Sequence, residues 1–374
     1  MSEKQDLAVP TARCTMMQPW RGILAVLVSV GLTIGIMSNF TLDSWLGWYT
    51  VWGNSLIPMQ VVIGLAWGAQ YPPTHGLDQP WRGMALTLLQ VLVGSIAALF
   101  LVKFVGGGSA NPVVNTFTIS CVLVTFFLII AFGCWPFHTL STPARGLLPL
   151  VFVYPIMAIL FRLYNFSDLL KAIPPLASIA PTGPIPWDIA LPFFFTMFAF
   201  LFVFVTMDMW PLYKIPGIMK EPVLGIVLVI LCAALAYVAY IVFVGSLAIK
   251  PLNWMLGFLC FVAGILTTVI ALQGWPGRSL SQPAKGFINL IFSGAVAILL
   301  YLFYHAFAVY HFGAGPMSTY PLNLFILGNM MLAATFPLYV IYSIFFDYWP
   351  LPATSICEER AASTGGAAKQ ADAG

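Results

Sequence analysis

The chain alternates between long apolar runs and short polar or proline-rich junctions. Each apolar run is about 20 residues long, the length that a helix needs to cross the hydrocarbon core of a bilayer. The first run is expected to be a retained span, because no A-x-A cleavage site follows it. We therefore predict an all-α polytopic integral membrane protein with about ten transmembrane helices in five hairpins. The spans are expected near residues 22–40, 51–70, 83–105, 113–134, 146–165, 187–207, 223–247, 254–273, 286–308 and 322–346.

One junction recurs along the sequence. Trp135-Pro136 returns 140 positions later as Trp275-Pro276, and Gly146 returns as Gly286 at the same offset. This periodicity predicts a tandem duplication of a four-helix module. The copies have the same topology because each crosses the membrane an even number of times, so they form parallel repeats. The predicted divisions are a cytoplasmic N-terminal tail at 1–19, an extra hairpin at 20–70, modules at 71–210 and 211–350, and a disordered cytoplasmic tail at 351–374.

Composition identifies the medium that surrounds the protein. Hydrophobic residues make up 60% of the chain and charged residues 7%, with a mean hydropathy of +0.94. A soluble domain has about a quarter charged residues, so the lipid bilayer is the expected partner of most of this surface. The net charge of +3 is small and spread over many loops, which excludes nucleic acid as a partner. The six cysteines form no C-x-x-C motif and indicate neither a disulfide framework nor a zinc site.

The positive charges predict the orientation. Loops rich in lysine and arginine stay in the cytoplasm. With ten spans, eleven of the fifteen basic residues fall on the side of the termini and the Trp-Pro junctions, and the other side holds only Lys103, Arg162, Lys171 and Lys250. We therefore expect both termini to be cytoplasmic, in a bacterial-type inner (plasma) membrane.

Neutral polar residues and prolines inside the spans are the candidate binding groups. A proline frees the carbonyl one turn before it, and freed carbonyls bind cations or polar solutes in transporters. Pro58 lies in the second span and Pro337 in the tenth, both near amide side chains. The predicted site lies between the duplicated halves and is lined by Asn54, Gln60, Asn115, Asn329, Tyr154 and Tyr301. The alternative is that these groups form hydrogen bonds between helices and stabilise packing.

Ionisable residues are almost absent from the spans, which disfavours a carboxylate-based proton pump. Asp208 and Asp347 each precede a Trp-Pro pair by two residues and are expected at the cytoplasmic rim, either paired with neighbouring basic residues or as a handle for a proton or cation. His75 and His138 occupy similar positions at two junctions, but the other modules have Tyr213 and Arg278 there. Because arginine is not a metal ligand, we expect no metal site. No catalytic motif is present, and no cofactor is specified.

These patterns leave three functions open. The first is a permease or channel for a small neutral or weakly charged solute. The second is a non-transporting membrane subunit that anchors or assembles a protein partner through the cytoplasmic junctions. The third is a membrane enzyme acting on a lipid or a quinone. The fold alone does not distinguish them.

Overall fold

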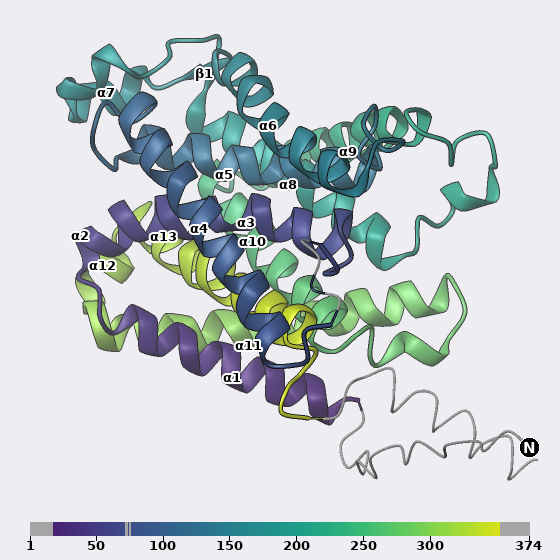
Figure 1. Cartoon of the computed structure of the whole chain (residues 1–374). Helices are drawn as coiled ribbons and strands as arrows, with labels where there is room; N and C mark the ends of the chain where they lie inside the picture. Colours follow the sequence, from purple (N-terminus) through teal and green to yellow (C-terminus); the bar gives the residue numbers. More distant parts are fainter. Residues whose placement is uncertain (1–17, 72–73, 75, 352–374) are drawn as a thin grey trace, which may run out of the picture.

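The computed structural model describes residues 18–71, 74 and 76–351, and most of these are helical (Figure 1). Within these residues, nine helices are long and apolar enough to cross a membrane. The prediction of a polytopic helical membrane protein is thereby confirmed in its coarse form. The segment 42–66 is also helical but is not among the nine, so the count of ten spans and the duplication stay predictions. Most of both predicted tails lies outside the described residues.

Five helical segments form the interior. On four of them, 50–78% of the most apolar 18-residue stretch is buried inside the protein, whereas the corresponding share is 22–33% on the remaining spans. A helix that is apolar on every side is stable only when protein surrounds it. The inner segments are α2 (Leu42–Ser44), η1 (Trp45–Tyr49), α3 (Thr50–Val61) and η2 (Val62–Ala66); α5 (Pro112–Phe126) and η3 (Phe127–Ala131); α8 (Trp187–Thr206); α10 (Pro251–Leu266) and η7 (Thr267–Ala271); and α13 (Leu322–Gly328), η9 (Asn329–Thr335), α14 (Phe336–Val340) and η10 (Ile341–Phe345).

Five further helices lie outside this group. Their outward faces carry exposed leucine, isoleucine and phenylalanine side chains, as expected for surfaces in contact with lipid. They are α1 (Trp20–Met37), α4 (Trp81–Phe104), α6 (Thr142–Phe161), α9 (Val223–Tyr240), which continues into η6 (Ile241–Ser246), and α11 (Ala284–Phe312).

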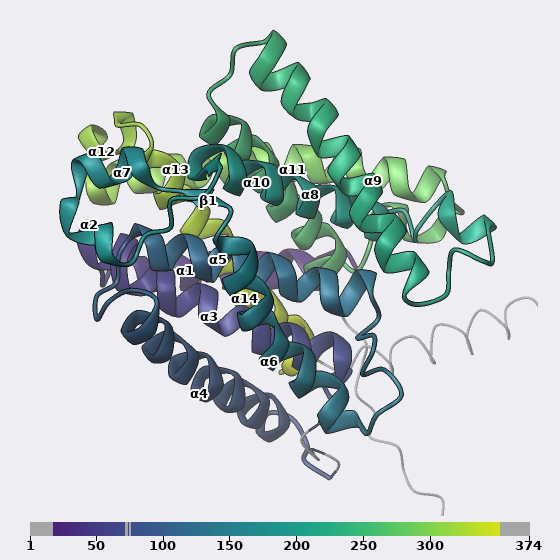
Figure 2. The same cartoon turned by 90° about the horizontal axis from the view of Figure 1, so that it is seen from above.

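The inner helices form a closed ring in chain order. Contacts run from α3 to α5, to α8, to α10, to α13, and from η9 back to α3. Each outer helix packs over the seam between two inner helices: α4 over α3 and η10, α6 over α5 and η2, α9 over α8 and η3, α11 over α10 and α8, and α1 over η9 and η7. The peripheral positions of α4 and α9 are visible from above (Figure 2).

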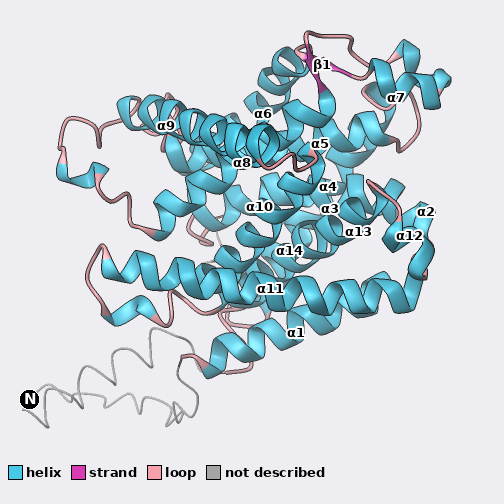
Figure 3. Ribbon diagram, turned by 180° about the vertical axis from the view of Figure 1, so that it is seen from behind, coloured by secondary structure: helices cyan, strands magenta, loops and turns pink. Residues whose placement is uncertain are grey.

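Two ends of the bundle differ in structure. One end, which we call the corner end, carries the links from an inner helix to the next outer helix, with the short 3-10 helices η5 (Leu212–Lys214) and η8 (Gly277–Ser279). The other, the connector end, carries α2, α7 (Ser167–Ala172), η4 (Pro174–Ser178) and α12 (Ala314–Ser318). Its link 162–186 includes the parallel pair β1 (Tyr164–Asn165) and β2 (Ile185–Pro186), the only strands among the described residues (Figure 3).

We call the segment that follows each of the five inner helices a corner, and all five corners share one backbone conformation. After each inner helix, two successive residues adopt positive φ, a left-handed conformation that ends a helix. At four corners the helix ends in a π-helical turn, whereas α8 lacks one. The pairs are Gly68 and Ala69, Gly133 and Cys134, Asp208 and Met209, Gln273 and Gly274, and Asp347 and Tyr348.

Each outer helix begins with a glycine packed against the end of an inner helix from another hairpin. A Cβ at any of these glycines would lie closer than 3.0 Å to that neighbour, so only glycine allows the approach. The contacts are Gly22 with Leu272, Gly83 with Phe346, Gly146 with Trp67, Gly225 with Phe132, and Gly286 with Met207.

For three of the outer helices, the residue before the proline that precedes the helix is a glutamine. It links the start of the outer helix to the end of the inner helix on which that outer helix packs. The Gln79 side chain accepts a hydrogen bond from Gly83 N at 3.2 Å and donates one to the carbonyl of Phe345 at 2.8 Å. It thereby satisfies an unpaired N–H at a helix start and a carbonyl at a helix end. Gln18 and Gln282 bond the backbone N of Gly22 and Gly286 in the same way.

Candidate functional site

A small cavity lies on the axis of the inner ring. All five inner helices contribute to its lining, and its volume is about 20 Å³. A cavity needs at least about 10–15 Å³ to hold a water molecule, so this space admits little more than one. The lining residues are Asn54, Ile57, Ile119, Val122, Leu123, Phe126, Phe195, Phe198, Leu266, Leu332 and Phe336.

Phenylalanine rings close the axis. The Phe126 ring centroid lies 5.1 Å from that of Phe198, 5.3 Å from that of Phe202 and 6.0 Å from that of Phe336. The pairs with Phe198 and Phe202 are edge-to-face, an arrangement that is favourable beyond the apolar area that the rings bury. We call Phe126, Phe198 and Phe336 the axial plug. All three residues line the axial cavity.

Asn54 and Asn329 meet at Thr50. The Asn54 amide donates to the Thr50 carbonyl at 2.8 Å, and the Asn329 amide donates to the Thr50 hydroxyl. The Thr50 hydroxyl in turn donates to the carbonyl of Trp45 at 3.0 Å. The structure therefore brings two of the predicted site residues together, at the contact between α3 and η9, and both amides bond to protein.

A cluster of hydroxyl groups lies beside this contact. Thr335 on η9 bonds to the Tyr304 hydroxyl of α11 and lies 3.0 Å from the Thr33 hydroxyl of α1. The Tyr49 hydroxyl donates to the carbonyl of Ala333 at 3.5 Å. Ala333 lies four residues before Pro337 in the π-helical η9, so this tyrosine bonds a carbonyl in the region where the proline was predicted to free one. The sequence interpretation missed Tyr49 and Tyr304, which no local pattern marks as polar partners.

The other predicted site residues lie elsewhere. The Gln60 amide donates to the Pro337 carbonyl at 2.8 Å, and the Asn115 amide donates to the Leu46 carbonyl at 2.7 Å. Tyr154 is half-buried on α6. Tyr301 lines a separate groove of about 460 Å³ between α10 and α11. Of the six predicted residues, only Asn54 lines the axial cavity.

Both rim aspartates lie at corners. Asp208 and Asp347 are the first positive-φ residues after α8 and η10. The Asp208 carboxylate accepts hydrogen bonds from Lys285 Nζ at 2.7 Å and Gln282 Nε2 at 2.9 Å. Partial burial of the carboxyl opposes ionisation, but these hydrogen bonds outweigh it and hold the pKa of Asp208 below its usual value.

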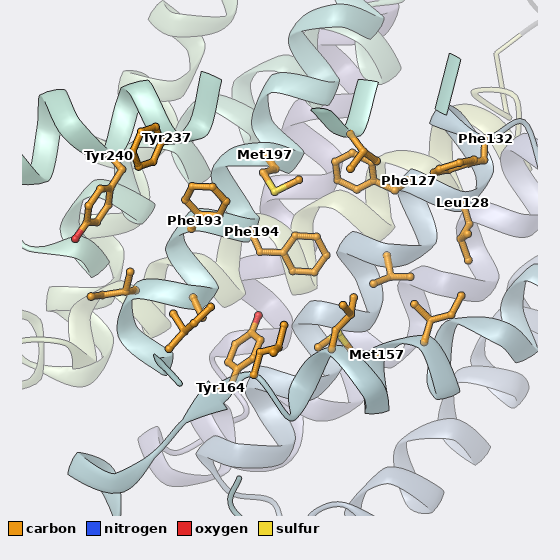
Figure 4. Close-up of a pocket in the computed structure, with 18 residues that line it drawn as sticks. Phe127, Leu128, Phe132, Met157, Tyr164, Phe193, Phe194, Met197, Tyr237 and Tyr240 are labelled. Atoms are coloured by element: carbon orange, nitrogen blue, oxygen red, sulfur yellow. The ribbon is translucent and has the colours of Figure 1, made fainter. Parts of the chain in front are cut away.

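A much larger cavity opens on the side of the bundle. This lateral groove, of about 640 Å³, lies between α5, α6, α8 and α9 (Figure 4). Its walls are apolar except for tyrosine hydroxyls, of which that of Tyr164 lies 3.3 Å from the Ser120 hydroxyl. The lining consists of Val124, Phe127, Leu128, Phe132, Ile156, Met157, Leu160, Leu163, Tyr164, Ile185, Ile189, Ala190, Phe193, Phe194, Met197, Val229, Tyr237 and Tyr240.

No group of three or more histidine, cysteine, aspartate or glutamate side chains suited to a metal occurs within the described ranges.

Comparison of the chain with protein-family models, curated proteins and solved structures gives no match. The geometry described above is therefore the basis for any functional assignment.

Proposed function

We propose that the protein is a membrane channel or permease for a small neutral or weakly charged solute, closed by the axial plug. The observation that carries the proposal is the cavity on the ring axis, to which every inner helix contributes. A ring of helices around one axis is the arrangement that a pore requires. A ring of apolar side chains closes such a path by excluding water.

The chemistry of the axis favours a neutral solute. No charged side chain lines the axial cavity, and Asn54 is its polar member. An ion would lose its hydration there without replacement, at high cost. A neutral solute that displaces the plug meets the Asn54 amide, with Thr50 and Asn329 directly behind it.

The proposal includes the orientation and the internal repeat. The corners and both termini lie in the cytoplasm of a bacterial-type inner membrane. Modules 71–210 and 211–350 are tandem copies preceded by the hairpin 20–70. Two observations support the repeat. All five corners have the same backbone conformation, and each outer-helix glycine contacts the inner helix three hairpins further along, counted cyclically.

Flux through proteoliposomes tests the proposal. Phe126→Leu with Phe198→Leu shortens two plug side chains while keeping them apolar, which is milder than alanine substitution. We expect a faster stopped-flow permeation of glycerol or urea than in wild type. Asn54→Leu added to this variant is expected to reduce the permeation again.

A matched control is Phe100→Leu with Phe303→Leu, both on exposed faces of outer helices. This variant should permeate like wild type. If the plug variant is folded but as impermeable as wild type, the axial path is wrong. If the control variant leaks equally, the effect comes from general loosening of the bundle.

A further inference from the structure

The lateral groove is preformed and faces the lipid. Residues beside it on the outer surface, such as Ile159 on α6 and Ile230 on α9, are 70% and 61% exposed. In a helical membrane protein such a surface is solvated by hydrocarbon. At about 640 Å³, the groove is within the usual size range of small-molecule sites.

The connector end of the groove is held in place by hydrogen bonds. Gly183 N donates to the carbonyl of Tyr164 at 2.7 Å, and Ile185 N donates to that of Leu163 at 3.0 Å. A Cβ at Gly183 would collide with the backbone at Arg162 and Leu163, so the loop packs as closely as glycine permits. Tyr164, Leu163 and Ile185 therefore form a fixed end wall.

A positive charge stands at this end. Arg162 directly precedes the lining residues Leu163 and Tyr164 and is exposed. Its guanidinium makes no hydrogen bond or ion pair with any residue that the structure describes, whereas its backbone N–H bonds to the carbonyl of Ile159 at 3.3 Å. The nearby Lys171, by contrast, is paired with Asp168 at 2.7 Å. Arg162 is thus the cation left for a phosphate, which guanidinium groups bind well.

We propose that the lateral groove binds an acyl chain of an anionic phospholipid, with the lipid phosphate at Arg162. The long apolar groove takes the chain, and the arginine beside its end wall takes the headgroup. The proposal concerns lipid binding alone and does not depend on solute flux.

Native mass spectrometry of the full-length protein, delipidated in detergent, tests this site. Dioleoyl phosphatidylglycerol and dioleoyl phosphatidylcholine are then added in equal amounts. The two lipids have the same acyl chains and differ in net charge. We expect one bound lipid per protein, with phosphatidylglycerol preferred by about tenfold, because both lipids carry the phosphate but the choline ammonium of phosphatidylcholine repels Arg162. Absence of any stoichiometric lipid would overturn the proposal.

Two groove-filling variants and one charge variant localise the site. Ala190→Trp on α8 fills the groove, and Ile156→Trp fills it from α6 if the first variant does not fold. Either is expected to lose the retained lipid, whereas Leu92→Trp on the exposed face of α4 keeps it. Arg162→Gln should equalise the two lipids, and Lys103→Gln should not. Lipid retention by a groove-filling variant would contradict the assignment. So would an unchanged preference for phosphatidylglycerol in Arg162→Gln.

Discussion

The Asn329 side chain donates a hydrogen bond to the hydroxyl of Thr50, although the two residues are 279 positions apart in the chain. This bond joins the first inner helix to the last. It lies at the contact between η9 and α3 that closes the ring. Asn329, which the sequence predicts as a solute-binding residue, therefore also connects the first and last inner helices.

A double-mutant cycle measures the contribution of the Asn329–Thr50 hydrogen bond to stability. Asn329→Leu and Thr50→Val should each destabilise the protein, and their combined cost should be smaller than the sum of the two. Hydrogen bonds between membrane helices contribute about 0.6 kcal/mol on average and up to about 1.7 kcal/mol. Unfolding by denaturing detergent gives the free energies. Strict additivity would show that the two side chains do not interact.

The two glycines of α10 should respond differently to one methyl group. A Cβ at Gly264 would collide with the backbone oxygen of Ser293, whereas a Cβ at Gly257 meets nothing within 4 Å. Gly264→Ala is expected to cost about 1–3 kcal/mol through overpacking. Gly257→Ala should be neutral or stabilising by up to about 1 kcal/mol, because alanine favours helix. Thermal unfolding in detergent compares them, and equal effects would contradict the close contact of α10 with α11.

Stability should depend on pH through Asp208. Its folded pKa lies below the unfolded value, so ionised Asp208 stabilises the fold above the unfolded pKa of about 3.9, and this contribution is lost as pH falls through the lower, folded pKa. Wild type should therefore lose more Tm than Asp208→Asn between about pH 6 and about pH 3. Asp168→Asn is the control, since that pair is highly exposed. Parallel pH profiles for wild type and Asp208→Asn would rule out this contribution.

Cysteine labelling tests the orientation. Cys14 and Cys357 are replaced by serine, and the four described cysteines are buried. Single cysteines at Ser141 and Ser279, both exposed at corners, should react from the cytoplasmic side only. Cysteines at Ser109 and Ser318, exposed at the connector end, should react from the opposite side only. Labelling of Ser141→Cys and Ser279→Cys from different sides would contradict the single corner end.

The helices were predictable from sequence, because an apolar run of bilayer length has few alternatives. The predicted spans 187–207 and 254–273 agree closely with α8 and with α10 continued by η7. The partners of polar side chains were not predictable. Gln60 bonds to a carbonyl 277 positions away, and no local pattern encodes such a contact. Nor does the sequence indicate that Gly83 packs on Phe346 and not on its own hairpin partner.

The wall between the axial cavity and the lateral groove is one helix thick. Phe126 lines the axis, and its neighbour Phe127 lines the groove; Phe195 and Phe194 divide in the same way on α8. Identical side chains at adjacent positions thus serve two compartments. If both proposals hold, replacing these phenylalanines one at a time should alter permeation at Phe126 and Phe195 and lipid retention at Phe127 and Phe194. A hydropathy profile gives all four positions the same value, because it does not record the direction in which a side chain points.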